Sequence, residues 1–193
     1  ASPYVRKINV LLHELGKSDM VQRAPVVTTA FNSADDLVAA NPLGKIPALE
    51  IEDGRVLYDS RVISAFLNDH FGGSLYPDDN WQTQLVEATG DGIMDCTVSM
   101  VYEVRLRPEN EQSSQWIEAQ WAKASRAVAA LNAGFIDHLN GPMTMGHIAV
   151  GCALGYIDFR HSARGWRNEN PALADWFANF SQRPSMKTTE PKG

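Results

Sequence analysis

The first residues with chemical potential are Ser2 and Pro3, at the head of the sequence. Ser followed by Pro is a common helix start, because the serine oxygen caps free amides and proline suits the first helical position. A helix N-terminus also carries partial positive charge, and it lowers the pKa of nearby thiols. A hydroxyl there can donate a hydrogen bond to an anion. Both roles are therefore open to Ser2, as a helix cap and as a group that stabilises an anion.

The second such stretch is NPLGKIPAL, in which Pro47 opens a predicted strand. Proline has no amide hydrogen to give to a sheet, so it belongs at a strand edge or start. If the bond to Ile46 is cis, Ile46 presents an unpaired N–H and C=O to an extended peptide, as in strand addition. The alternative is a proline that only starts a strand.

The third is Asp59-Ser60, where a predicted hairpin ends and a helix begins. Either residue suits an N-cap, which is the simple interpretation. The free amides of the same helix start attract a carboxylate, while Asp59 can pair with an amine. A ligand with both an α-amine and an α-carboxylate fits this corner.

Several other classes of site are disfavoured by the composition. Cys96 and Cys152 form no CxxC pair and the five histidines are scattered, so neither a disulfide framework nor a metal site is expected. A formal charge of -6 without a basic cluster argues against nucleic acid. No apolar run is long enough for a membrane span, and no signal peptide is visible, which predicts a cytoplasmic protein.

The elements that must position these residues follow from hydrophobic spacing. Apolar residues three and four apart predict a helix over residues 4–15, closed by Gly16. The β-branched stretch 24–31 predicts a strand, and Ser33 is the expected cap of a short helix over 34–40. Asp53-Gly54 predicts a tight antiparallel hairpin, and helical spacing follows in SRVISAFLNDHFGG.

The pattern changes to long helices after a segment rich in Gly, Pro and Asp. We therefore predict a small α/β domain over residues 1–72, a linker over 73–80 and an all-helical domain over 81–193.

The whole chain resembles a known family. The runs SPYVRKINVLL, NPLGKIPALEIEDGRVLYDSRVISAFL, IAVGCALGYIDFR and RPSMKTTEP are similar, in order, to cytosolic-type glutathione S-transferases, and to bacterial glutathione-transferase-like proteins in particular. The resemblance implies a thioredoxin-like N-terminal domain, a helical C-terminal domain and a homodimer. It also implies glutathione as co-substrate and no metal.

The resemblance assigns roles to the glutathione corner. It implies that Ile46, before a cis Pro47, pairs its backbone with the cysteinyl unit of glutathione. Asp59 and Ser60 match the acidic-Ser pair that holds the γ-glutamyl group. Lys45 matches a lysine that often reaches the glycyl carboxylate.

Ser2 falls where the serine-type classes of the family place the hydroxyl that stabilises the glutathione thiolate. Arg6 lies four residues on, on the same side of the helix, and is expected to help polarise the site. The electrophile pocket of such proteins lies between the first helix and the long helix after the linker. Its expected lining is Tyr4, Met94, Met100, Tyr102, Arg105 and Trp166, with core or dimer interface as the alternative for each.

Two departures from the family pattern matter. Family members have a β-strand before this serine, so we expect residues ahead of Ala1, and an upstream Ser, Cys or Tyr is an alternative catalytic group. The helix after Thr144 usually has an acidic residue three positions after its cap, where this chain has His147. A neutral imidazole can accept the returning hydrogen bond of a capping box, but less well than a carboxylate.

The leading hypothesis is an enzyme that ionises the glutathione thiol and directs it onto a small hydrophobic electrophile or a peroxide. Thiol-disulfide exchange is an alternative that requires an upstream cysteine, since residues 1–20 contain none. A non-catalytic ligand carrier or protein-docking module is the third possibility, because fold does not determine function.

Overall fold

A computed structural model describes residues 1–79 and 81–192 of the chain. Its first element is helix α1, Pro3–Glu14, as the spacing predicts. Ser2 caps this helix, because its Oγ accepts a hydrogen bond from the Val5 amide at 3.3 Å. The apolar stripe of α1 is buried, and the helix ends at Leu15 and Gly16.

The predicted strand over residues 24–31 is wrong. The segment is not paired with any described strand, and Val27 and Phe31 are exposed. Two backbone hydrogen bonds between Thr29 and Asn32 close a turn instead, at 3.0 and 3.3 Å. β-branched residues favour a strand only where a neighbouring strand pairs with them.

Helix α2, Asp35–Ala40, occupies the predicted place but starts differently. Its N-cap is Ala34, and no side chain caps it, so the assignment of Ser33 as cap is wrong. Asp35 and Asp36 in the first turn provide negative charge near the positive end of the helix.

The predicted hairpin is confirmed. Strand β1, Leu49–Glu50, pairs antiparallel with β2, Val56–Leu57, so that Leu49 lies opposite Leu57. Gly54 has φ 83°, which a turn of this kind requires and which glycine adopts without strain. Helix α3, Ser60–His70, follows directly.

The rest of the described chain is helical. Its elements are α4 (Trp81–Leu106), a short 3-10 helix (Glu109–Glu111), α5 (Ser114–Gly134), α6 (Ile136–Leu139), α7 (Met145–His161), a second 3-10 helix (Ser162–Arg164), α8 (Pro171–Phe180) and α9 (Pro184–Thr188). None of the helices in the described part has the length and apolar character needed to cross a bilayer.

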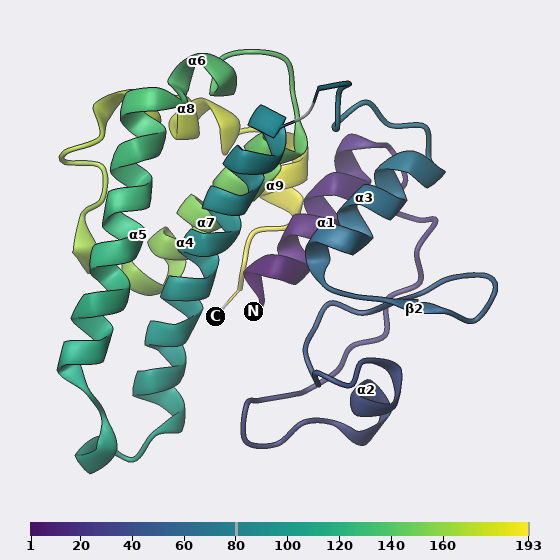
Figure 1. Cartoon of the computed structure of the whole chain (residues 1–193), viewed down its shortest axis with the longest axis horizontal. Helices are drawn as coiled ribbons and strands as arrows, with labels where there is room; N and C mark the ends of the chain where they lie inside the picture. The colour runs from purple at the N-terminus through teal and green to yellow at the C-terminus, as the bar shows by residue number, and fades with distance from the viewer. Residues whose placement is uncertain (80, 193) are drawn as a thin grey trace.

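Helix α7 forms the centre of the core. Nearly all of its residues as far as Ile157 are buried, and α1, α4 and α8 all pack against it. Figure 1 shows α4 and α5 side by side, α1 and α3 side by side, and the two termini close together between these pairs. The N-terminal ends of α1 and α3 lie near each other in the middle of the view of Figure 1, above α2, and the residues of chemical interest on both helices begin there.

Candidate functional site

The hydroxyl of Ser2 lies at the N-terminal end of α1, and its O–H donor is still free to form a hydrogen bond. Its oxygen accepts the Val5 amide hydrogen, which leaves the O–H available to donate. Ser2 is therefore a cap whose hydroxyl donates to no acceptor among the described residues. The geometry is compatible with both roles that the sequence left open.

The segment around Pro47 presents free backbone groups. The Ile46-Pro47 bond is cis, and within the described residues neither the N–H nor the C=O of Ile46 has a hydrogen-bond partner. The preceding turn is held by Asn41, whose side-chain amide donates to the Lys45 carbonyl at 2.8 Å. Lys45 itself is exposed. Ile46 lies in a half-buried bend three residues before β1, and its free backbone groups of both kinds can accept an extended peptide.

Asp59 and Ser60 begin α3. Asp59 is the N-cap, and its carboxylate accepts from the Arg61 amide and pairs with the Arg61 guanidinium, each at 3.0 Å. Desolvation raises the pKa of this carboxyl, but the hydrogen bonds and charge of Arg61 outweigh it, so the pKa lies below its ordinary value. Asp59 is thus a stable anion at the surface, beside the buried Ser60.

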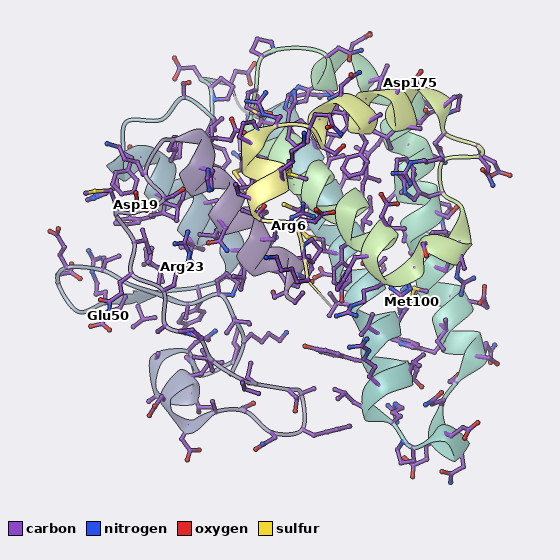
Figure 2. All side chains as sticks on the ribbon, turned by 180° about the vertical axis from the view of Figure 1, so that it is seen from behind. Arg6, Asp19, Arg23, Glu50, Met100 and Asp175 are labelled. Atoms are coloured by element: carbon purple, nitrogen blue, oxygen red, sulfur yellow. The ribbon has the colours of Figure 1, made fainter. Side chains whose placement is uncertain are left out.

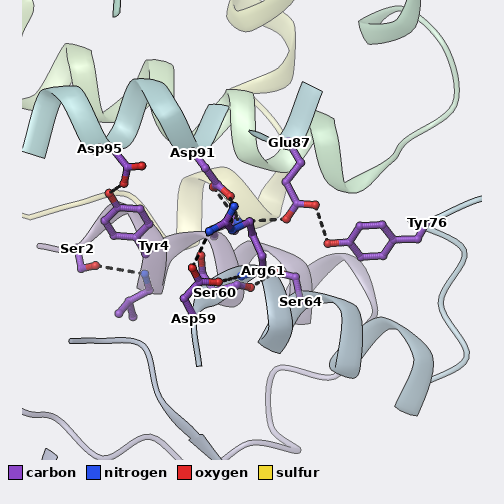
Figure 3. A network of polar contacts seen from close by, with 12 residues as sticks. Ser2, Tyr4, Asp59, Ser60, Arg61, Ser64, Tyr76, Glu87, Asp91 and Asp95 are labelled. Carbon is purple, nitrogen blue, oxygen red and sulfur yellow. Dashed lines mark hydrogen bonds and ion pairs between the residues drawn. The ribbon is translucent and has the colours of Figure 1, made fainter. Parts of the chain in front are cut away.

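Behind this corner lies a buried polar network that sequence reasoning missed. The Lys7 ammonium is fully buried and contacts Glu87 at 3.1 Å and Asp91 at 2.8 Å. Glu87 also accepts from the Tyr76 hydroxyl at 2.8 Å, and the Arg61 guanidinium lies 3.9 Å from Asp91 (Figure 3). These contacts join α1 and α3 to α4.

The network shifts the ionisation of its members. Desolvation raises the pKa of Asp91, and it does so against the lowering effect of Lys7. A signal for the network was present in the sequence. Glu87, Asp91 and Asp95 recur every four residues, which places three carboxylates on one face of α4, and Lys7 interrupts the apolar stripe of α1.

Arg6 lies where α1 meets the C-terminal segment (Figure 2). Its guanidinium donates to the Met186 carbonyl at 3.0 Å and to the Thr189 hydroxyl at 3.4 Å. Arg6 and Ser2 nevertheless line the same cavity, of about 140 Å³. Its other polar or reactive lining residues are Asn9, Cys152, Tyr156 and Thr189. Burial raises the pKa of the Cys152 thiol to about 11, which leaves it an inert thiol at neutral pH.

The residues expected to line the electrophile pocket differ in exposure. Tyr4 is half-buried and its hydroxyl donates to Asp95, while Tyr102 and Arg105 on α4 are exposed. Met94, Met100 and Trp166 are each buried, with at most 5% of their surface exposed, and their place in the electrophile pocket stays a prediction. Met94 and Met100 lie on α4, and Trp166 lies in the turn after the second 3-10 helix, where its ring packs edge-on against Phe177 of α8.

No three His, Cys, Asp or Glu side chains lie together as a metal site would require, in the ranges 1–79 and 81–192. Cys96 is half-buried, and desolvation raises its pKa. The groups that the described residues bring to the site are backbone groups, hydroxyls and charged side chains.

The chain was compared with protein families, and both halves of it match glutathione S-transferase domains. Residues 1–70 match the family profile described as glutathione S-transferase, N-terminal domain, and residues 114–179 match the corresponding C-terminal domain. The chain is similar to the uncharacterized GST-like protein YibF of Escherichia coli (strain K12), with 32% identity over 98% of this chain and 95% of that protein.

Two solved structures are similar over almost their whole length. One is a glutathione transferase family member from Pseudomonas fluorescens Pf-5 with bound glutathione, at 44% identity and a TM-score of 0.97, covering 100% of this chain and 96% of that one. The other is a glutathione S-transferase from Methylobacillus flagellatus KT with glutathione bound, at 34% identity and a TM-score of 0.85, covering 99% and 96%.

Proposed function

This chain belongs to the glutathione S-transferase family, and from that premise we propose that it is a glutathione transferase, which holds the glutathione thiol as a thiolate for attack on a small electrophile or a peroxide. It has the fold of the family, with a thioredoxin-like N-terminal domain and a helical C-terminal domain. The two similar structures named above contain bound glutathione, which supports glutathione as the ligand here.

The observation that carries the proposal is the free backbone of Ile46 beside Pro47. An unpaired N–H and C=O on one residue can form two hydrogen bonds with the peptide backbone of a tripeptide. In this proposal the cysteinyl unit of glutathione binds there, and the exposed Lys45 approaches the glycyl carboxylate. Each direct hydrogen bond to a charged group contributes about 1.5 to 3 kcal/mol.

The other end of glutathione then lies at the start of α3. Its γ-glutamyl carboxylate accepts from the free amides and the Ser60 hydroxyl, and its amine pairs with the anionic Asp59. Arg61 keeps the Asp59 carboxylate in place through two contacts of 3.0 Å. The amine is therefore held by a carboxylate that is already oriented.

Thiolate formation is assigned to the N-terminal end of α1. The Ser2 hydroxyl donates its free hydrogen to sulfur, and the partial positive charge of the helix end adds to the effect. Lowering a thiol pKa by about two units corresponds to about 2.7 kcal/mol of thiolate stabilisation. The ionised thiol is then positioned for attack, and Arg6 contributes positive charge to the same cavity.

The test is a glutathione titration monitored by the ultraviolet absorbance of the thiolate near neutral pH, with Ser2→Ala as the variant. We expect binding with an ionised thiol in the parent protein and a raised thiol pKa in Ser2→Ala. Ser74→Ala, an exposed loop serine, is the matched control and should behave like the parent. A helix cap contributes about 1 kcal/mol to stability, so folding of Ser2→Ala is checked first by thermal unfolding.

Three results would contradict parts of this proposal. An intact thiolate in Ser2→Ala would move the role to another group. Binding without turnover of any electrophile or peroxide would indicate a ligand carrier. Absence of glutathione binding would contradict the proposed enzymatic function and favour a docking module.

We also propose a homodimer, which light scattering of the purified protein tests.

A further inference from the structure

Asn41 holds the loop that leads from α2 to Ile46. Its Nδ2 donates to the Lys45 carbonyl at 2.8 Å, and its Oδ1 accepts from the Leu43 amide at 3.0 Å. Its own backbone carbonyl accepts from the Gly44 amide at 2.8 Å. Within residues 1–79 and 81–192, every hydrogen bond of loop residues 42–46 ends on Asn41.

The place of Asn41 in the fold explains why it can hold this loop. Asn41 ends α2 with only 1% of its surface exposed, and its amide donates to the Leu37 carbonyl at 2.7 Å. Leu37, one turn earlier on the same face, is the buried residue of α2, which Figure 1 shows apart from the other helices. The side chains of the loop residues Pro42, Leu43 and Lys45 are exposed. Hydrogen bonds rather than side-chain packing therefore hold the loop.

The bond to Lys45 controls a group that a ligand needs. The Lys45 carbonyl and the Ile46 amide belong to one trans peptide unit, in which the N–H points opposite to the C=O. Because Asn41 holds this carbonyl, the Ile46 N–H points away from Asn41, and it has no partner among the described residues. A hydrogen bond to the carbonyl also polarises the peptide unit, which makes its N–H a stronger donor.

Gly44 constrains the path of the same loop. Its φ is 60°, a left-handed conformation that glycine adopts without strain. A Cβ at this position would lie 2.8 Å from the Ser33 Oγ, closer than ordinary contacts allow. The loop therefore passes close to Ser33, and a larger residue at position 44 would have to shift it.

We propose that Asn41 is a positioning residue for glutathione: its side-chain amide fixes the Lys45–Ile46 peptide unit so that the Ile46 N–H donates to a peptide carbonyl of the ligand. This inference rests on the proposed function, which places the cysteinyl unit of glutathione at Ile46. Asn41 acts through Ile46 and does not itself contact the ligand. A binding edge that is ordered before the ligand arrives binds more tightly, because less conformational entropy is lost on binding.

The test uses Asn41→Asp, which keeps the shape of the side chain. Near about pH 7.5 the aspartate is charged, so it accepts from the Leu43 amide but cannot donate to the Lys45 carbonyl. Near about pH 4.5 burial favours the neutral carboxyl, which can donate again. The probes are glutathione and S-methylglutathione, of which the second has no thiol to ionise. Calorimetry gives each dissociation constant relative to that of the parent protein at the same pH.

Asn68→Asp is the matched control. The buried Asn68 on α3 forms the same two kinds of bond, because its Nδ2 donates to the Gly73 carbonyl at 3.2 Å and its Oδ1 accepts from the Leu75 amide at 2.9 Å. It holds the turn after α3, outside the proposed glutathione site. Gly44→Ala is a second loop variant, which shifts the loop without adding an ionisable group. Thermal unfolding first establishes that each variant is folded at the temperature of the titration.

We expect Asn41→Asp to bind both probes about tenfold more weakly than the parent near about pH 7.5, which corresponds to about 1.4 kcal/mol. Most of this loss should be recovered near about pH 4.5, where the carboxyl donates to the Lys45 carbonyl. Gly44→Ala should show a similar loss at both pH values, and Asn68→Asp should bind as the parent does.

Other outcomes overturn the inference in distinguishable ways. Affinity equal to that of the parent in Asn41→Asp overturns the positioning role and leaves the proposed function intact. A loss that does not recover at the lower pH overturns the donor role of the Asn41 amide, and an equal loss in Asn68→Asp attributes the effect to general destabilisation. If Asn41→Asp does not fold, unchanged affinity in Gly44→Ala overturns the inference. If the parent binds neither probe, both proposals fail.

Discussion

The two halves of α4 differ in how many of their charged side chains are paired within the protein. In the N-terminal half, Glu87 and Asp91 are buried and each has a charged or hydroxyl partner from α1, α3 or the segment between α3 and α4. In the C-terminal half, the buried Glu103 pairs with Arg107 at 2.9 Å, but Tyr102 and Arg105 are exposed, and Arg105 has no carboxylate partner among the described residues. One helix thus contains two kinds of charged site. We call Lys7, Glu87 and Asp91 the closed network, and the exposed Tyr102 and Arg105 the open cluster.

The difference separates structural charge from charge that is available for binding. A buried ion pair loses hydration, so it persists only when every member is satisfied within the protein. A charged side chain that is exposed at the surface keeps water as a hydrogen-bond partner and can exchange that water for a ligand. We therefore expect the closed network to respond to mutation in stability and the open cluster in affinity.

The largest expected effect comes from opening the closed network. Lys7→Met leaves Glu87 and Asp91 as buried carboxylates without their cation, and it should lower the free energy of unfolding by about 3 to 5 kcal/mol. Denaturant unfolding measures this change. Adding Asp91→Asn to Lys7→Met should recover part of the loss, because one uncompensated charge is removed.

The open cluster provides the contrast for that experiment. Arg105→Gln should change the free energy of unfolding by no more than about 0.5 kcal/mol, as surface substitutions usually do. A loss of less than 1 kcal/mol in Lys7→Met, or a loss in Arg105→Gln that equals it, would remove the distinction between the two halves of α4.

A second prediction concerns the packing that holds α4 against α7. A Cβ on Gly90 would lie 2.8 Å from the Ala149 carbonyl carbon and 2.9 Å from the Val150 nitrogen, both backbone atoms of α7. Gly90→Ala should therefore destabilise the fold by about 1 to 3 kcal/mol, as overpacking does, and it should disturb both halves of α4 together.

Gly92 is the matched control on the same helix. A Cβ there meets nothing within 4 Å, so Gly92→Ala should raise stability by about 0.5 to 1 kcal/mol through helix propensity alone. Thermal unfolding of the two variants gives the comparison. Equal melting temperatures would show that the close approach of α4 and α7 does not constrain position 90.

The smallest effect is expected at His147, a buried side chain of which one ring nitrogen has a hydrogen-bond partner and the other has none within the described chain. Its Nδ1 accepts from the Thr144 amide at 3.1 Å, which confirms the predicted capping box, but its Nε2 has no partner among the described residues. Burial lowers its pKa from 6.5 to about 4, and the neighbouring His138 adds to the effect.

The sign of the resulting pH dependence follows from these values. Between about pH 6.5 and 4 the unfolded chain binds a proton at His147 that the folded chain does not, so stability falls as pH falls through this window. His147→Asp replaces the imidazole by a carboxylate at a helix start and should add about 0.5 to 1 kcal/mol at pH 7. Denaturation at pH 7 and pH 5 should show a smaller acid loss in the variant. An identical pH slope in both proteins would exclude His147 as its source.

Local signals in the sequence were reliable where one residue type meets one backbone requirement. Ser2-Pro3, Asp53-Gly54 and Asp59 each define a cap or a turn that the structure contains. Prediction failed at residues 24–31, where extended residues lack a pairing strand, and at Ser33, where the helix starts one residue later than its best cap. Both outcomes depend on contacts that local propensity does not encode.

By itself, the sequence determined the main helices, the hairpin turn and the family, while it left the cis bond at Ile46-Pro47 as one of two alternatives. These follow from periodicity and turn chemistry, which act over a few residues. Only the tertiary structure decided which charges are satisfied. Lys7 lies 80 residues or more from its carboxylates, and Met94 is buried in the core. Burial and pairing are properties of the packed chain, because both depend on which surfaces exclude water from each other.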